Sequence, residues 1–197
     1  MPSTPTTPLA NGEKSGRRGQ ILIAAAELFA QHGFHGVGID DIGAAVGISG
    51  PALYRHFRSK DAMLGEMLTS ISEYLLAGGE SHAEHDGGPD EVLAALVRFH
   101  VDFALTHPAL ITVQERSFAN LADTDRRQVR ALQRRYVEVW VRAIRAAVPG
   151  LDQAHARSAA HAVFGLINST PHSRHLPDDE LAPLLQRLAL GALRAAR

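Results

Sequence analysis

The segment from residue 33 to residue 64, GFHGVGIDDIGAAVGISGPALYRHFRSKDAML, constrains the fold of this chain more than any other feature. Its apolar residues Ile39, Ile42 and Val46 recur at i, i+3 and i+7, which predicts one face of a short helix. Gly47 follows directly, and glycine most readily takes the left-handed conformation found at helix ends. The pattern therefore predicts a short helix that stops at a sharp corner.

A second short helix is expected directly after that corner. Ser49 suits the N-cap position, and Pro51 suits the first turn, where its missing N–H is not needed. Leu53 and Phe57 are expected to face inward. Two short helices joined by a glycine-containing corner form a helix-turn-helix, whose second helix enters the major groove of DNA.

A third helix is expected over residues 60–77, with Ser59 as its cap. Lys60 then lies in the first turn, where the helix dipole disfavours a cation. Helix N-termini bind anions, so we expect a phosphate of DNA to lie beside Lys60.

An amphipathic helix is expected before the corner, ended by Gly33. Arg17 and Arg18 lie at its start, where cations suit a contact with the DNA backbone. Its apolar face is formed by Ile21, Leu22, Ala25, Leu28 and Phe29.

With these features, residues 17–64 resemble the DNA-binding domain of the TetR family of transcriptional repressors. The resemblance implies an all-α fold, with an N-terminal three-helix helix-turn-helix DNA-binding domain followed by a helical-bundle ligand-binding and dimerisation domain. The residues that carry it are Gly33-Phe34, Asp41-Ile42, Ala45, Gly47-Ile48-Ser49, Leu53-Tyr54, His56-Phe57, Ser59-Lys60-Asp61 and Leu64.

Some positions depart from the family pattern and bear on the DNA sequence that is read. Gly38 replaces the usual Ser or Thr cap, and Gly50 opens the recognition helix without a polar side chain. Arg55 is then the long donor that can reach a guanine edge, and Asp40 can accept from a cytosine amino group. The expected DNA-binding residues are Arg17, Arg18, Gly38, Asp40, Ser49, Gly50, Pro51, Ala52, Tyr54, Arg55, His56 and Lys60.

Composition sets the outer bounds of the prediction. The 197 residues are 45% hydrophobic and carry a net charge of −1, with no cysteine and no run of 18 apolar residues. Residues 1–60 hold six Lys or Arg against four Asp or Glu, so this N-terminal part is mildly basic, whereas residues 61–197 are acidic. We expect a disordered arm over residues 1–16, the DNA-binding domain over 17–62, and an effector-binding and dimerisation domain over 63–197.

Helical periodicity continues through the remaining chain. A glycine-rich loop is expected over residues 78–89, and a break over 169–177. Helices are expected over 90–106, 108–120, 123–148, 152–168 and 178–196.

Two apolar stripes near the C-terminus are candidates for a dimer contact. The resemblance implies that two copies pair here in a four-helix bundle, whereas periodicity alone equally allows these residues to complete the core of one chain. They are Val163, Phe164, Ile167, Leu181, Leu184 and Leu188.

The resemblance also implies a small-molecule effector that binds among the middle helices. Its binding shifts the helix that follows the DNA-binding domain, which is called the reader below. An acyl-CoA compound or another apolar metabolite is the expected class. The five arginines between Arg126 and Arg135 either form a solvated face or bind the phosphates of such a ligand. The expected effector-binding residues, for which core packing is the alternative, are Phe103, Gln114, Phe118, Trp140 and Asn168.

The sequence thus predicts a ligand-responsive transcriptional regulator, a repressor that binds a palindromic operator in double-stranded DNA as a homodimer. It is expected to be cytoplasmic and to have no membrane partner. No catalytic residue or cofactor is expected, because no nucleophile motif or phosphate loop is present. No metal site is expected either: the histidine pairs 82/85 and 172/175 have i, i+3 spacing but lie in loop-like segments without cysteine, and zinc sites normally need four ligands. Two alternatives stay open: a constitutive DNA-binding or scaffold protein, and a helical ligand-binding or catalytic protein with a vestigial reader.

Overall fold

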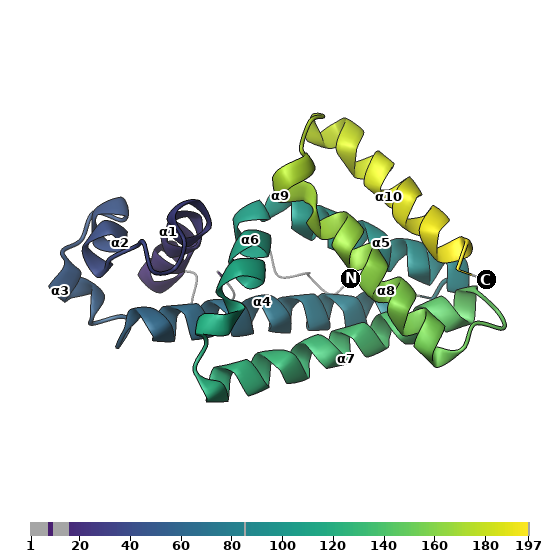
Figure 1. The fold of residues 1–197 in the computed structure, drawn as a ribbon, viewed down its shortest axis with the longest axis horizontal. Coiled ribbons are helices and arrows are strands. Elements are labelled where there is room, and N and C mark those ends of the chain that lie inside the picture. Colours follow the sequence, from purple (N-terminus) through teal and green to yellow (C-terminus); the bar gives the residue numbers. More distant parts are fainter. Residues whose placement is uncertain (1–7, 10–15, 85, 197) are drawn as a thin grey trace. The chain divides into compact units, whose positions relative to one another are not determined.

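The computed structural model describes residues 8–9, 16–84 and 86–196, and these form helices joined by short connections, with no strand among them (Figure 1). The chain divides into two compact units: Met1–Tyr74 with Ala109–Leu132, and Leu75–Pro108 with Gln133–Arg197. The expected disordered arm lies outside the described residues, apart from residues 8, 9 and 16. Among the described residues, no helix is long and apolar enough to cross a membrane.

The reader in the first unit is built as expected from α1 (Arg17–His32), α2 (Ile39–Ala45) and α3 (Gly50–Leu53). The predicted apolar face of α1 is buried, except that Leu28 is half-buried. Gly33 ends α1 with a φ of 75°, in the region that favours glycine. The apolar periodicity thus predicted this element correctly.

The corner between α2 and α3 has the expected caps. Gly38 is the N-cap of α2, and its backbone N–H donates to the Asp41 carboxylate at 2.7 Å. Gly47 follows α2 with a φ of 70°, and the Ser49 hydroxyl accepts from the Ala52 N–H at 3.4 Å. The recognition helix is short, as expected: α3 ends at Leu53, and residues 54–56 continue as turns.

Helix α4 (Lys60–Ala83) begins at the predicted cap, because the Ser59 hydroxyl accepts from the Ala62 N–H at 3.0 Å. It runs past residue 77, so the expectation of a loop beginning at Gly78 is wrong. A Cβ atom on Gly78 would lie 2.1 Å from the ring of Phe99, and one on Gly79 would lie 2.6 Å from the ring of Tyr136. These glycines therefore admit aromatic rings against a continuous helix.

In the second unit, α5 (Pro89–Thr106), α8 (Gln153–Asn168) and α10 (Asp178–Arg194) pack against one another (Figure 1). Asp152 caps α8 as predicted, accepting from the His155 N–H at 2.8 Å. The expected break over 169–177 contains a further short helix, α9 (Thr170–Ser173).

Two long helices are each divided between the units. They are α4, divided after Tyr74, and α7 (Asp123–Ala147), divided after Leu132. Before α7, the expected helix over 108–120 is in fact α6 (Pro108–Ser117) followed by a 3-10 turn, η2 (Phe118–Asn120).

Candidate functional site

The corner between α2 and α3 presents its polar residues outward. Ser49, Pro51 and Arg55 are exposed, and the Tyr54 side chain is 55% exposed. Leu53 and Phe57 are buried as predicted, and they anchor the segment from Ser49 to Arg55 on the core. The arrangement leaves the recognition segment free to enter a groove while its apolar residues fix its direction.

Asp40 and Gly50 come together across the corner. Gly50 is buried, and a Cβ atom there would lie 2.1 Å from the Asp40 Oδ1 atom. The Asp40 carboxylate therefore rests on the backbone that opens α3, while the residue as a whole stays exposed. The predicted contacts of α2 and α3 thus share one surface.

Three exposed arginines surround this surface. Arg55 stands on the turn after α3, and Arg17 donates to the Val46 carbonyl at the end of α2. Arg58, which our sequence interpretation did not include, is also exposed. A cation between the recognition turn and the Ser59 cap was the signal that would have identified it.

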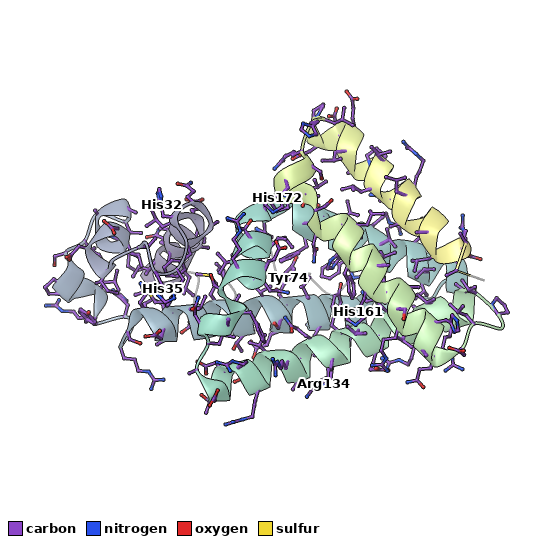
Figure 2. All side chains as sticks on the ribbon, in the orientation of Figure 1. His32, His35, Tyr74, Arg134, His161 and His172 are labelled. Atoms are coloured by element: carbon purple, nitrogen blue, oxygen red, sulfur yellow. The ribbon has the colours of Figure 1, made fainter. Side chains whose placement is uncertain are left out.

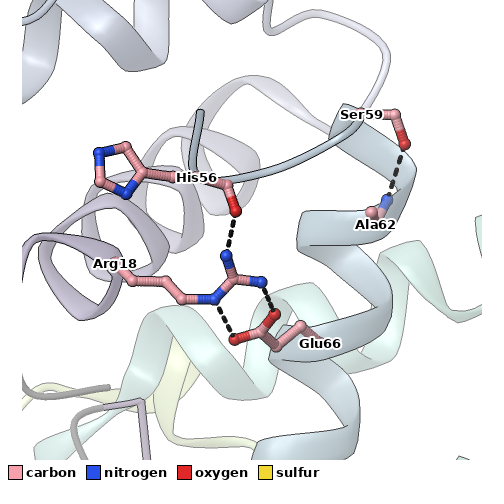
Figure 3. A network of polar contacts seen from close by, with 5 residues as sticks. All are labelled: Arg18, His56, Ser59, Ala62 and Glu66. Carbon is pink, nitrogen blue, oxygen red and sulfur yellow. Dashed lines mark hydrogen bonds and ion pairs between the residues drawn. The ribbon is translucent and has the colours of Figure 1, made fainter. Parts of the chain in front are cut away.

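Arg18 points inward and holds three elements together (Figure 3). Its Nε donates to Glu66 of α4 at 3.0 Å, and a second nitrogen pairs with the other Glu66 oxygen. Its remaining terminal nitrogen donates to the His56 carbonyl, and the guanidinium carbon lies 3.9 Å from the centre of the Phe57 ring. Arg18 therefore positions the reader on α4, a role that the sequence did not indicate.

Lys60 is also turned toward the protein. Its Nζ donates to the carbonyl oxygens of Phe34 and Val37, each at 2.8 Å, and lies 4.5 Å from the centre of the Phe34 ring. These acceptors account for a cation in the first turn of a helix without any phosphate. The phosphate contact of Lys60 stays a prediction, and the two carbonyl contacts give its ammonium group a structural role.

A polar cleft of about 480 Å³ lies beside the Arg18–Glu66 pair, within the first unit. Both charge signs line it, with Arg58 from the segment before α4, Glu73 from α4 and Asp125 from α7. The cleft exposes part of the connection between reader and α4 to solvent.

The second unit contains a buried cluster of aromatic and polar side chains centred on His100 of α5. His100 Nδ1 lies 3.0 Å from the Tyr136 hydroxyl, and Nε2 lies 3.1 Å from Asn168 Oδ1. Burial lowers the pKa of His100 to about 4, against the opposing effect of the Asn168 hydrogen bond. The imidazole is therefore neutral at pH 7.

Trp140 and Phe164 complete this aromatic cluster, which consists of His100, Phe103, Tyr136, Trp140, Phe164 and Asn168. The Trp140 and Phe164 ring centres lie 4.9 Å apart, edge to face. The Trp140 Nε1 atom is buried with no hydrogen-bond partner among the described residues, which costs about 1–3 kcal/mol. Such convergent polar groups in an apolar setting are typical of ligand sites.

The structure divides the expected effector residues. Phe103, Trp140 and Asn168 belong to the aromatic cluster, whereas Gln114 and Phe118 belong to the first unit. His100 and Tyr136, at the centre of the cluster, were missed. His100 continues the buried face of α5 at helical spacing, and this was the signal available for it.

Family models match both parts of the chain. Residues 21–67 match the model for bacterial regulatory proteins of the tetR family, and residues 86–172 match a tetracyclin repressor-like C-terminal domain. Together the matches cover more than half of the chain. The chain belongs to the TetR family.

Curated relatives of this TetR-family chain are transcriptional regulators. The activator FasR of Mycolicibacterium smegmatis is 37% identical over 44% of this chain and 40% of its own length. The repressor KstR2 of Mycobacterium tuberculosis is 30% identical over 58% of each protein. The chain thus spans about half the length of the curated relatives it matches.

A solved TetR-family regulator from Bordetella parapertussis shares the fold with a TM-score of 0.81. It is 25% identical, and the similarity covers 89% of this chain and 94% of that one. The all-α fold with its N-terminal helix-turn-helix is therefore as the resemblance implied.

The dimer stripes of this TetR-family chain are only partly accessible. Val163, Ile167 and Leu181 are buried within the chain itself, so they contribute little to a contact with a second copy. Phe164 and Leu184 are half-buried, and Leu188 is 49% exposed. The exposed side of α10 is therefore the part of the predicted interface that remains available.

The arginine run on α7 does not form one basic face. Arg126 donates to the Leu121 carbonyl at 2.6 Å, and Arg135 pairs with Glu80 at 3.1 Å. Arg130 lies 5.4 Å from the centre of the Phe118 ring, and Arg127 is exposed. Arg134 is also exposed on α7 (Figure 2). Groups of the same chain thus contact Arg126, Arg130 and Arg135. Phosphate binding stays a prediction for Arg127 and Arg134.

Proposed function

We propose that this chain is a ligand-responsive transcriptional regulator, a repressor that binds a palindromic operator as a homodimer in the cytoplasm. The observation that carries the proposal is the outward-facing segment 49–55, anchored on the buried Leu53 and Phe57 and flanked by exposed arginines. Base edges are read by such a segment, and the flanking cations contact phosphates.

A single reader makes few contacts with DNA, so high affinity for the operator requires two readers in one dimer. A dimer places two recognition segments on half-sites one turn of DNA apart, about 34–36 Å. The second half-site then binds at a high effective concentration. The exposed side of α10, with Leu188 at its centre, is the proposed contact.

The effector site is proposed at the aromatic cluster of the second unit. Two proteins of the same fold were solved with acyl-CoA compounds: AibR with isovaleryl coenzyme A and operator DNA, and Bacillus subtilis FadR with stearoyl-CoA. They are 20% and 16% identical to this chain, with TM-scores of 0.71 and 0.69, and the similarity covers 85% and 88% of it. This similarity shows the fold alone, so the effector of this chain is argued from its own residues.

Helix α4 is the proposed route from effector to reader, because it carries residues of both units. Arg18 and Lys60 bind its first turns to the reader, so a shift of α4 carries the reader with it. A coupling free energy of about 1–3 kcal/mol, typical of allosteric systems, would release the operator.

Selection of bound sequences from a random DNA pool, repeated with metabolite mixtures, tests the proposal. A palindromic motif that is lost with one mixture is the expected result. A motif that no mixture displaces, with no shift in melting temperature, would favour the constitutive DNA-binding protein. Failure to retard any DNA at about 100 mM salt, where specific readers still bind, would favour the vestigial reader.

A further inference from the structure

Trp140 is the only tryptophan of the chain. Its indole N–H is buried and has no hydrogen-bond acceptor in the described part of the chain. Its side chain is 0% exposed. Buried donors in folded proteins almost always have a partner, so an unpaired one calls for a physical explanation. A ligand that supplies the missing acceptor is such an explanation at a proposed effector site.

The polar groups of His100, Tyr136 and Asn168 in the aromatic cluster form hydrogen bonds with one another. Asn168 Oδ1 can only accept, so His100 Nε2 carries the hydrogen of that pair. His100 Nδ1 is then the acceptor for the Tyr136 hydroxyl. Both nitrogens of the imidazole are therefore used by Tyr136 and Asn168, and the indole N–H takes no part in these hydrogen bonds.

The neighbours that the structure does give the indole are aromatic rings. Phe164 lies at 4.9 Å with an interplanar angle of 73°, and Tyr136 lies at 6.3 Å with an angle of 79°. A ring face offers an N–H group only a weak interaction. Phe164 is half-buried, so its ring is the one that an entering ligand would displace.

The same surroundings define the ligand. The aromatic cluster contains no charged side chain, since His100 is neutral, so a charged group placed there would lose its hydration without gaining a counter-ion. The aromatic rings favour an apolar body. The ligand therefore needs one uncharged acceptor oxygen on an otherwise apolar skeleton.

We propose that the effector carries a neutral carbonyl group, as in a ketone, ester or thioester, whose oxygen accepts a hydrogen bond from Trp140 Nε1. The inference rests on the proposed function, because it names the chemistry that the effector site recognises. Binding of the carbonyl compound opens the aromatic cluster at Phe164 and satisfies the indole.

The single indole N–H gives a direct measurement. In ¹⁵N-labelled protein, the one indole resonance is followed while cyclohexyl methyl ketone is added, and again with isopropenylcyclohexane, in which =CH₂ replaces the carbonyl oxygen. We expect the ketone to move the indole proton downfield with saturation and to bind about tenfold more tightly than the hydrocarbon, the ratio that 1.4 kcal/mol gives. Equal responses to both probes, or an unmoved indole proton at saturation, would overturn the inference.

The variant Trp140→Phe removes the N–H and keeps an aromatic ring. Calorimetry should show that the ketone loses its advantage over the hydrocarbon, while the hydrocarbon binds the variant and the natural chain alike. An undiminished preference for the ketone would count against the inference. Where the variant fails to fold, the two-probe titration of the natural chain decides alone.

Operator binding by the natural chain is measured in parallel by gel retardation. A chain that binds its selected DNA but has a silent indole refutes the carbonyl contact and leaves the proposed function standing. A chain that binds no DNA refutes the proposed function, whatever the indole reports.

Discussion

Arg55 is the residue whose loss separates base reading from backbone binding. It is exposed on the turn after α3 and is the long donor of the recognition segment. Arg55→Ala should weaken operator binding by roughly 1–3 kcal/mol and relax the preference at one base pair, because a bidentate guanine contact is lost. Gel retardation on operator variants measures this. Arg58→Ala is the matched control, and it should weaken binding to all sequences alike.

Lys60 should affect stability before it affects DNA binding. Its ammonium group donates to the carbonyls of Phe34 and Val37, and each hydrogen bond to a charged group is worth about 1.5–3 kcal/mol. Lys60→Met should therefore lower the free energy of unfolding by an amount of that order, measured by urea denaturation. Arg58→Met, which removes an exposed cation, should leave it nearly unchanged. Unaltered stability with a flatter salt dependence of DNA binding would instead establish Lys60 as a phosphate contact.

His100 predicts a loss of stability in acid. Its pKa falls from 6.5 to about 4 on folding, so between these pH values the unfolded chain binds a proton that the folded chain excludes. Stability should be fully present above pH 6.5 and should fall by about 3 kcal/mol as the pH drops toward 4. Urea denaturation across this range measures the loss. His100→Gln keeps an amide donor and acceptor without a titrating group, and should show a shallower pH dependence; parallel curves for the two proteins would refute the assignment.

At the scale of a helix, the two glycines inside α4 are required by packing. Gly78→Ala should destabilise the chain by about 1–3 kcal/mol, because the new methyl group would lie 2.1 Å from the Phe99 ring. Helix propensity alone predicts the opposite, a gain of about 1 kcal/mol. Gly165→Ala is the matched control, since nothing lies within 4 Å of its Cβ position in α8, and it should stabilise. Thermal denaturation of both variants tests the comparison, and a stabilised Gly78→Ala protein would contradict it.

These glycines also show what the sequence could predict. The Ser49 cap and the buried residues Leu53 and Phe57 depend on neighbours along the chain, so local rules located them, whereas the Gly38 cap was placed by the family resemblance. The end of α4 depends on Phe99 and Tyr136, far away in sequence, and a glycine pair without that knowledge indicates a loop. The same limit hid the structural roles of Arg18 and Lys60 and the central place of His100, because their partners are distant in the chain.

At the scale of the whole molecule, the two proposed activities belong to different units. The recognition segment lies in the first unit and the aromatic cluster in the second, and α4 and α7 contribute residues to both. Separate units allow each site its own chemistry, an exposed polar surface for DNA and a buried aromatic one for the effector. In the proposed mechanism, α4 is the element through which the effector site and the reader are coupled.

Pairing of two copies is the property of the whole molecule most open to test. Leu188 is 49% exposed on α10, and a large exposed apolar side chain suits a buried contact between copies. Leu188→Arg would place two unpaired charges in a two-fold interface, so native mass spectrometry should show a monomer where the natural chain is a dimer. Operator affinity should fall with it, because the second reader no longer binds at high effective concentration.

Ile23→Arg, at a 39% exposed site on α1, is the matched control and should remain dimeric. A dimer that persists in Leu188→Arg would place the contact elsewhere, and a natural chain that is monomeric at micromolar concentration would remove the basis for palindromic operator binding.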